Sequence, residues 1–250
     1  IKVAVQVSNP GAIDVTAGLP YAIYRREGAN RTLAVTGALP EVPSAARRVL
    51  WAGLGTLALV VTIGLYFLWL RGLPLLVLGA AGVVLVLTYT RWITRSPLLC
   101  LLAPGMGFGP IMVLGTVIAL GASIDSTALL ASLVALLMVS ELLLINQIPD
   151  AEADRAIGRR HLVITLGPEK AAHLVAGLLL ASYGVIVAGV ISGHLDMTGL
   201  IAVAPLPAAI WISLRLPRVL AMPDQLNRVL GANVAVLLST LALLVTGLSL

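Results

Sequence analysis

The sequence predicts an all-α fold, a bundle of helices that crosses a membrane several times. Aliphatic and aromatic residues make up 59% of the 250-residue chain and charged residues only 11%, whereas a soluble domain carries about 25% charged residues. The mean hydropathy is +1.04. Aromatic residues are scarce at 4%, which favours helices over a β-barrel with aromatic girdles. We therefore expect a polytopic helical bundle in a lipid bilayer.

Seven long apolar segments follow one another along the chain, each near the roughly 20 residues that a helix needs to cross the hydrocarbon core. A shorter apolar segment at 1–12 is interpreted as part of a further helix, so about eight helices are expected. The chain starts without Met inside this run and shows no signal-peptide pattern, so we expect an N-terminally truncated protein. The seven segments are 47–70, 73–90, 98–121, 127–146, 171–193, 197–214 and 229–250.

The connections between these segments differ in length. Two of them, about 14–46 and 150–170, are long and polar, and short turns join some of the other segments. With no internal repeat evident, residues 1–250 are interpreted as one transmembrane domain. Small residues inside the segments predict close helix packing, and Pro104 and Pro110 predict a kink. The small pairs are Gly79 with Gly82, Gly105 with Gly109, and Gly115 with Ala119.

Fourteen of the sixteen basic residues gather on one side of the predicted bundle. When sides alternate from helix to helix, the second side holds only Arg71 and Lys2. By the positive-inside rule, the basic side faces the cytoplasm, so the pI near 9.9 needs no nucleic-acid partner to explain it. The residues on the basic side are Arg25, Arg26, Arg31, Arg47, Arg48, Arg91, Arg95, Arg155, Arg159, Arg160, Lys170, Arg215, Arg218 and Arg228.

The stretch after the fourth long segment carries the strongest chemical pattern. Asn146, Asp150 and Asp154 are spaced so that a helix presents them on one face at successive turns. Mg²⁺ takes oxygen ligands and bridges carboxylates to substrate phosphates. Arginine, present next to them at Arg155, Arg159 and Arg160, meets phosphate oxygens in a bidentate fork. The pattern therefore predicts a site for a magnesium-bound diphosphate on an apolar tail, although arginines at this position are also explained by topology alone.

The first long polar connection supplies a possible second half of this site. If Asp14 ends the first helix, its carboxylate can face Asp150 and Asp154 across a cavity and share one or two Mg²⁺ ions. Arg31 follows in the same connection and is a candidate phosphate contact.

Glu141 lies inside an apolar segment, where a carboxyl group is costly and turns toward a cavity or a partner. We expect it to face the active cavity as a base or acceptor-binding group. The alternative is a structural hydrogen bond or a protonated contact between helices.

These residues resemble the UbiA-type intramembrane aromatic prenyltransferases, most of all the 1,4-dihydroxy-2-naphthoate polyprenyltransferase branch of menaquinone biosynthesis. The family's second aspartate motif reads like N-D-x-x-D-x-x-x-D-R-x-x-G-[KR]-R-T-L, and this chain matches it from Asn146 to Gly167. Tyr89-Thr90 and the stretch Phe108–Gly115 also match. The order of segments is similar to a nine-helix bundle that lacks its first helix.

The chain departs from the family pattern in both aspartate motifs. Aligned on Asp14, the first motif has Pro10, Gly11 and Gly18 where the family has Asn, Asp and Asp. In the second motif, Gln147 replaces an Asp and His161 replaces a Thr. The metal-facing set implied by the resemblance is therefore reduced to Asp14, Asp150 and Asp154.

The resemblance implies Mg²⁺-dependent transfer of a polyprenyl group from its diphosphate to an aromatic acceptor, in a prokaryotic inner membrane with the active site facing the cytoplasm. It further implies that Tyr89 and Arg91 lie near the phosphates, although Arg91 is equally explained by topology. Two alternatives stay open: a catalytically decayed relative that binds isoprenoid lipid, and a transporter coupled through Glu141.

Overall fold

The computed structural model describes residues 3–7, 20–27, 30–38 and 42–250, with side chains described from residue 47 onward. The chain groups into two compact units, Ile1–Tyr66 and Phe67–Leu250. That the two act as one transmembrane domain stays a prediction.

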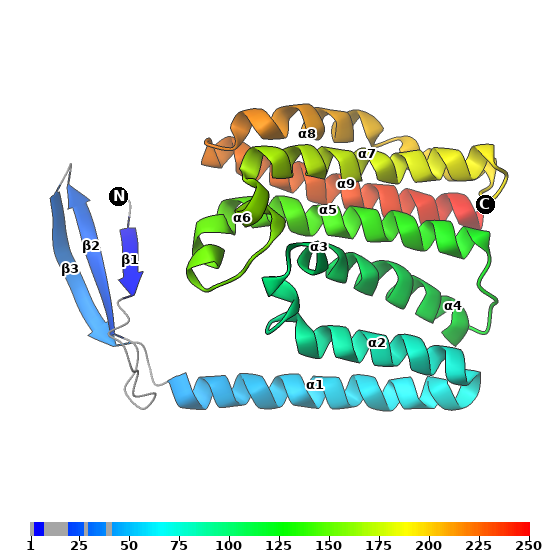
Figure 1. Cartoon of the computed structure of the whole chain (residues 1–250), viewed down its shortest axis with the longest axis horizontal. Helices are drawn as coiled ribbons and strands as arrows, with labels where there is room; N and C mark the ends of the chain where they lie inside the picture. The colour runs from blue at the N-terminus through cyan, green and yellow to red at the C-terminus, as the bar shows by residue number, and fades with distance from the viewer. Residues whose placement is uncertain (1–2, 8–19, 28–29, 39–41) are drawn as a thin grey trace. The chain divides into compact units, whose positions relative to one another are not determined.

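The first unit contains a three-stranded antiparallel sheet in the order β1-β2-β3 (Figure 1). Its strands are β1 (Val3–Val7), β2 (Pro20–Glu27) and β3 (Asn30–Ala38). The helix predicted over 1–12 is therefore wrong across Val3–Val7. The sequence there alternates Val with other residues, and 20–38 is rich in Tyr, Ile, Val and Thr, which is the period and composition of strands. The helix end predicted at Asp14 lies outside the described residues.

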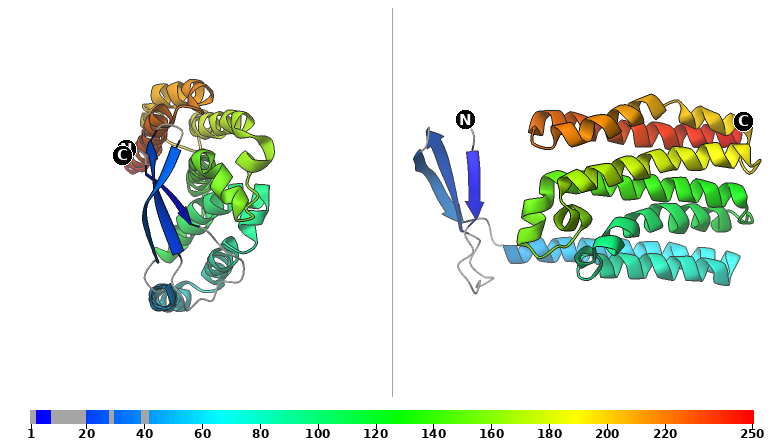
Figure 2. Two further views of the ribbon diagram at one scale, coloured as in Figure 1. Left: turned by 90° about the vertical axis from the view of Figure 1, so that its left-hand side faces the viewer. Right: turned by 45° about the horizontal axis from the view of Figure 1, so that its top comes forward.

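The second unit is a helical bundle, shown from two further sides in Figure 2. Helix α1 (Val42–Arg71) begins in the first unit and ends in the second. The other α-helices are α2 (Leu73–Tyr89), α3 (Pro97–Met106), α4 (Gly115–Ala119), α5 (Ser126–Ala156), α6 (Leu162–Leu166), α7 (Pro168–Ile191), α8 (Leu206–Val219) and α9 (Pro223–Ser249). Two short 3₁₀ turns, η1 (Ile93–Arg95) and η3 (Met197–Val203), and a π-helical stretch, η2 (Gly107–Leu114), complete the unit.

The described residues contain six helical stretches long and apolar enough to cross a membrane, and α2 is a shorter apolar helix. Together they coincide with the seven segments predicted from the sequence, so the polytopic helical fold is confirmed for residues 42–250. The π-helical stretch contains Pro110 and directly follows the helix with Pro104. The irregularity predicted at these two prolines is therefore present.

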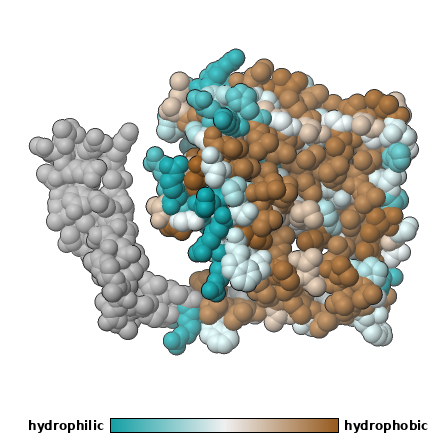
Figure 3. Space-filling view, in the orientation of Figure 1, coloured by the Kyte–Doolittle hydropathy of each residue, from teal (hydrophilic) through white to brown (hydrophobic). Residues whose placement is uncertain are grey.

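Helix α5 is central to the second unit, because α3, η2, α7 and α9 all pack against it. Its buried side chains Leu144 and Ile145 join a core with Leu179 of α7 and Ile212 of α8. Outside this core the bundle is covered with hydrophobic side chains, which dominate the face shown in Figure 3. An apolar exterior around a packed helical core suits a protein whose solvent is lipid.

Two buried polar contacts tie α9 into the bundle. Asn233 Nδ2 donates to Glu141 Oε2 at 3.0 Å, joining α9 to α5. The hydroxyls of Tyr183 and Thr240 lie 2.8 Å apart and join α7 to α9. Side-chain hydrogen bonds of this kind stabilise helix association where apolar side chains have little advantage over lipid.

The glycine pairs predicted to allow close packing behave differently. A Cβ at Gly105 would collide with Ser140 Oγ and Leu136 O, and a Cβ at Gly109 would lie 2.9 Å from Leu136 Cβ. This pair therefore lets α3 and η2 approach the backbone of α5. At Gly79 and Gly115 a Cβ would have no atom of the described residues within 4 Å, so the predicted role is wrong for those two positions.

Candidate active site

A pocket of about 130 Å³ lies at the charged end of α5. Asn146, Asp150 and Asp154 all line it, as their spacing on one helix face predicts. Asp154 is buried, whereas Asp150 and Asn146 are exposed. The remaining lining residues are Tyr89, Thr94, Cys100, Leu143, Gln147, Arg159 and His161.

The loop after α5 folds back onto this pocket. Gly158 has φ 80°, a left-handed conformation that glycine adopts without strain, and it turns the chain at the end of the helix. The amide of Arg159 donates to Asp154 O at 3.0 Å, and the amide of Arg160 donates to Thr94 O at 3.0 Å. These bonds fasten the loop to α5 and to η1, and so place the side chains of Arg159 and His161 beside Asp154.

Asp154 is held from both sides. Arg159 Nη1 donates to Asp154 Oδ1 at 2.9 Å, and His161 Nε2 lies 3.2 Å from Asp154 Oδ2 without hydrogen-bond geometry. Burial of the imidazole lowers the pKa of His161, and the nearby Asp154 carboxylate opposes this shift without overcoming it. The neutral imidazole is thus favoured, and Arg159 supplies the charge that balances Asp154.

Gln147, where the resemblance leads us to expect an Asp, is turned toward Cys100. Its Nε2 donates to Cys100 Sγ at 3.3 Å, and both side chains are buried. The carboxamide therefore binds a neighbour on α3 and leaves Asp150 and Asp154 as the carboxylates of the pocket.

The oxygen ligands of this pocket are suited to Mg²⁺ only when a substrate phosphate supplies further ligands. Among the residues that the structure describes, no group of three or more His, Cys, Asp or Glu side chains is suited to hold a metal. Mg²⁺ is usually held by one or two carboxylates, waters and substrate phosphates rather than by an all-protein cage. Asp150, Asp154 and the Asn146 amide fit that arrangement, because all three offer hard oxygen ligands in one pocket.

The comparison with known families decides the identity of the bundle. A family model described as the UbiA prenyltransferase family matches residues 22–224. The chain belongs to the UbiA prenyltransferase family. Family membership and the six long apolar helices make it an integral membrane protein, and the family's activity is prenyl transfer to aromatic acceptors. No curated protein and no solved structure matched the chain.

The other residues predicted for the site of this UbiA-family protein lie in several places. Arg155 lines a second pocket instead of the first. The exposed side chains of Arg91 and Arg160 line neither described pocket. Arg31 lies in β3 opposite Arg26, and Asp14 falls outside the described residues.

Glu141 does not line the pocket of Asp150 and Asp154. It is fully buried and accepts a hydrogen bond from Asn233, which corresponds to the structural alternative considered for it. We therefore leave Glu141 out of the proposed catalytic groups.

Thr94 and Cys100 line the pocket but were not predicted as site residues. A threonine between two arginines and a lone cysteine in an apolar helix carry no chemical pattern. Their place in the site follows only from the packing of α3 on α5 and of η1 on α3.

Proposed function

We propose that this protein transfers a polyprenyl group from polyprenyl diphosphate to an aromatic acceptor related to dihydroxynaphthoate, in menaquinone biosynthesis and with Mg²⁺. The observation that carries the proposal is the single pocket shared by Asn146, Asp150 and Asp154 at the charged end of an apolar bundle. A hydrophilic head and a long apolar tail are the two halves of a polyprenyl diphosphate.

In this proposal, Asp150 and Asp154 would hold Mg²⁺, and the Asn146 amide would orient the diphosphate. Bound Mg²⁺ neutralises charge that develops on the leaving diphosphate. Arg159 lines the same pocket and adds a guanidinium that binds phosphate while it positions Asp154. Arg91, Arg160, Arg31 and Asp14 stay as proposed contributors to substrate or metal binding, whereas Arg155 lines the second pocket.

The reaction breaks the allylic C–O bond of the diphosphate, which leaves with the bonding electrons. A carbon of the electron-rich aromatic ring then bonds to the allylic carbon, and that ring carbon loses its proton. Tyr89 lines the pocket, where an aromatic face stabilises a nearby cation. The apolar helices around the pocket keep water from quenching the cation.

A second candidate is the decayed relative that binds isoprenoid lipid without turnover. The observation in its favour is Gln147, whose amide is engaged with Cys100 where the family has a carboxylate. The two candidates differ in turnover and in metal dependence.

The proposed orientation places the pocket at the cytoplasmic face of a prokaryotic inner membrane. The described basic residues support it, because Arg91, Arg159, Lys170 and Arg215 all lie at the pocket end of the bundle, whereas Arg71 lies at the other, where its Nε donates to Ala119 O. Figure 3 shows hydrophilic residues gathered at the first of these ends.

The test is an assay of membranes with labelled polyprenyl diphosphate, Mg²⁺ and aromatic acids. Asp150→Asn removes a metal-binding charge from an exposed position, and we expect product formation to fall by about 100-fold. The matched control is Glu169→Gln, an exposed carboxylate at the same end that lines neither pocket, and it should keep full activity. Labelled diphosphate that binds without product, with or without Mg²⁺, would support the decayed relative instead.

A further inference from the structure

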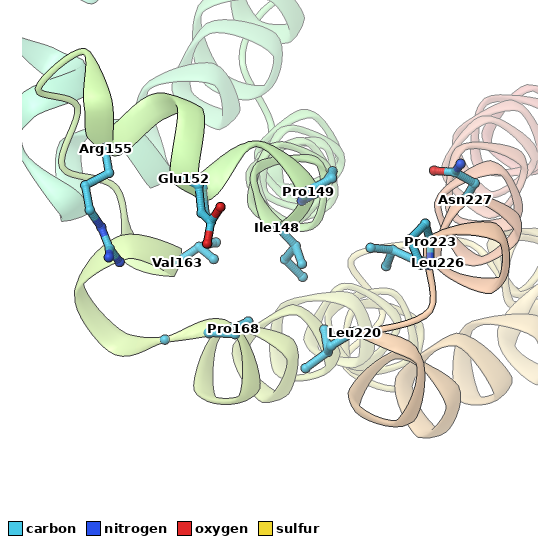
Figure 4. A pocket seen from close by; sticks show the side chains of 12 residues that line it. Ile148, Pro149, Glu152, Arg155, Val163, Pro168, Leu220, Pro223, Leu226 and Asn227 are labelled. Atoms are coloured by element: carbon cyan, nitrogen blue, oxygen red, sulfur yellow. The ribbon is translucent and has the colours of Figure 1, made fainter. Parts of the chain in front are cut away.

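A second and larger pocket, about 560 Å³ in volume, lies between the end of α5, the start of α7 and the turn from α8 to α9 (Figure 4). It shares no lining residue with the first pocket. Its walls include the buried side chains of Ile148, Val163 and Leu226. The volume falls within the range of about 300–1,000 Å³ typical of small-molecule sites, so the pocket is large enough for a ligand of its own.

Polar groups of opposite charge stand on one side of this pocket. Glu152 and Arg155 both line it, and their spacing places them on the same face of α5. Across residues 47–250, neither side chain forms a hydrogen bond or an ion pair with another described residue, and both are exposed. Asn227 of α9 adds an amide on the opposite side (Figure 4). The pocket thus contains one carboxylate, of Glu152, and one guanidinium, of Arg155, and neither is paired with another described residue.

The pocket extends from the apolar to the charged part of α5. Ile148 is buried among core side chains, and Arg155, seven residues later, is exposed at the hydrophilic end. Seven residues of helix rise about 10 Å, enough to cross the polar headgroup layer of about 5–8 Å on one side of a bilayer and to reach the hydrocarbon core. A lipid whose headgroup lay at Arg155 would have its ester region at the depth of the apolar wall.

We propose that this pocket binds the headgroup of a phospholipid that carries a primary ammonium, of the phosphatidylethanolamine type. The phosphate pairs with Arg155, the ammonium pairs with Glu152, and the Asn227 amide donates to a phosphate or ester oxygen. Because Glu152 and Arg155 cancel in charge, a purely anionic headgroup would meet a repelling carboxylate. A zwitterionic headgroup matches both charges.

The experiment uses the full chain, purified in detergent and mixed with equal amounts of phosphatidylethanolamine and phosphatidylglycerol of the same acyl composition. Native mass spectrometry reports which lipid stays bound. We expect the native protein to prefer phosphatidylethanolamine by about tenfold, the difference that one charge-assisted hydrogen bond provides. Glu152→Gln should reverse the preference toward the anionic lipid, because only Arg155 then carries charge. Arg155→Gln should weaken retention of both.

Glu169→Gln is the matched control, because this carboxylate lies at the same end outside the pocket, and it should leave the preference unchanged. Both pocket substitutions are on exposed side chains, and their unfolding midpoints in lipid-free micelles should equal that of the native chain. Equal retention of the two lipids by the native protein and by Glu152→Gln would overturn the proposal. So would displacement of the lipid by free phosphoethanolamine or by an aromatic hydroxy acid, since the pocket would then take a soluble ligand.

Discussion

The carboxylates of the pocket have unequal surroundings although they are one helical turn apart. Asp154 is buried and already paired with Arg159 at 2.9 Å, whereas Asp150 is exposed and has no ion pair with another described residue. We infer that Asp150 is the group freer to bind a cation, and that Asp154 is held in place before a substrate arrives.

Gln147 provides a test of the metal site at the scale of one residue. Gln147→Asp introduces a carboxylate where the resemblance to the family leads us to expect one, but it removes the donor to Cys100 and adds negative charge beside Asp150 and Asp154. Without metal, we expect the variant to lose about 1–3 kcal/mol of stability. Mg²⁺ should then raise its unfolding midpoint more than it raises that of the native chain, because ligand binding to the folded state adds stability.

The control for this prediction is Gln147→Asn, which keeps the amide and changes only its reach. A midpoint for Gln147→Asp that responds to Mg²⁺ no more than that of Gln147→Asn would show that the position does not face the cation.

Among the elements, the contact of α3 and η2 with α5 determines whether Cys100 and Gln147 meet. This contact depends on Gly105 and Gly109, where a side chain would strike the α5 backbone or Leu136. With no side chain at these glycines, the helix backbones pack directly against each other, as is common between membrane helices.

Gly109→Ala should therefore push η2 away from α5, and we expect a loss of about 1–3 kcal/mol of stability from overpacking. Thermal unfolding in detergent micelles is the measurement. Gly107→Ala serves as the matched control, since a Cβ there would meet no atom within 4 Å in the part of the chain that the structure describes. If the two substitutions lower the midpoint equally, the loss comes from the changed helix backbone and not from the contact.

For the whole molecule, the distribution of charge predicts the orientation in the membrane. Glu169 and Asp196 lie at the two ends of the α7 region, before and after its apolar span. In a chain with Cys100→Ala, a thiol introduced by Glu169→Cys should react with an impermeant reagent only from the cytoplasmic side. A thiol introduced by Asp196→Cys should react only from outside. The reverse pattern would contradict the positive-inside assignment.

The sequence predicted correctly those features that depend on a single helix. The seven apolar segments and the shared pocket of Asn146, Asp150 and Asp154 follow from hydropathy and from the period of one helix. The error at Val3–Val7 arose because the segment at 1–12 was interpreted from its apolar composition alone. The alternation of valine with other residues, a period of two, was the local signal for the strand.

Composition and helical periodicity alone determined that the chain is a helical membrane protein and that its carboxylates share a helix face, because both are properties of consecutive residues. Only the tertiary structure decided that Glu141 pairs with Asn233, that Gln147 turns to Cys100, and that Arg155 faces a second pocket. Each of these depends on which other helix packs beside α5. The two hydrogen bonds join residues that are 47 positions apart (Gln147 and Cys100) and 92 positions apart (Asn233 and Glu141) in the sequence, and the local sequence does not determine such pairs.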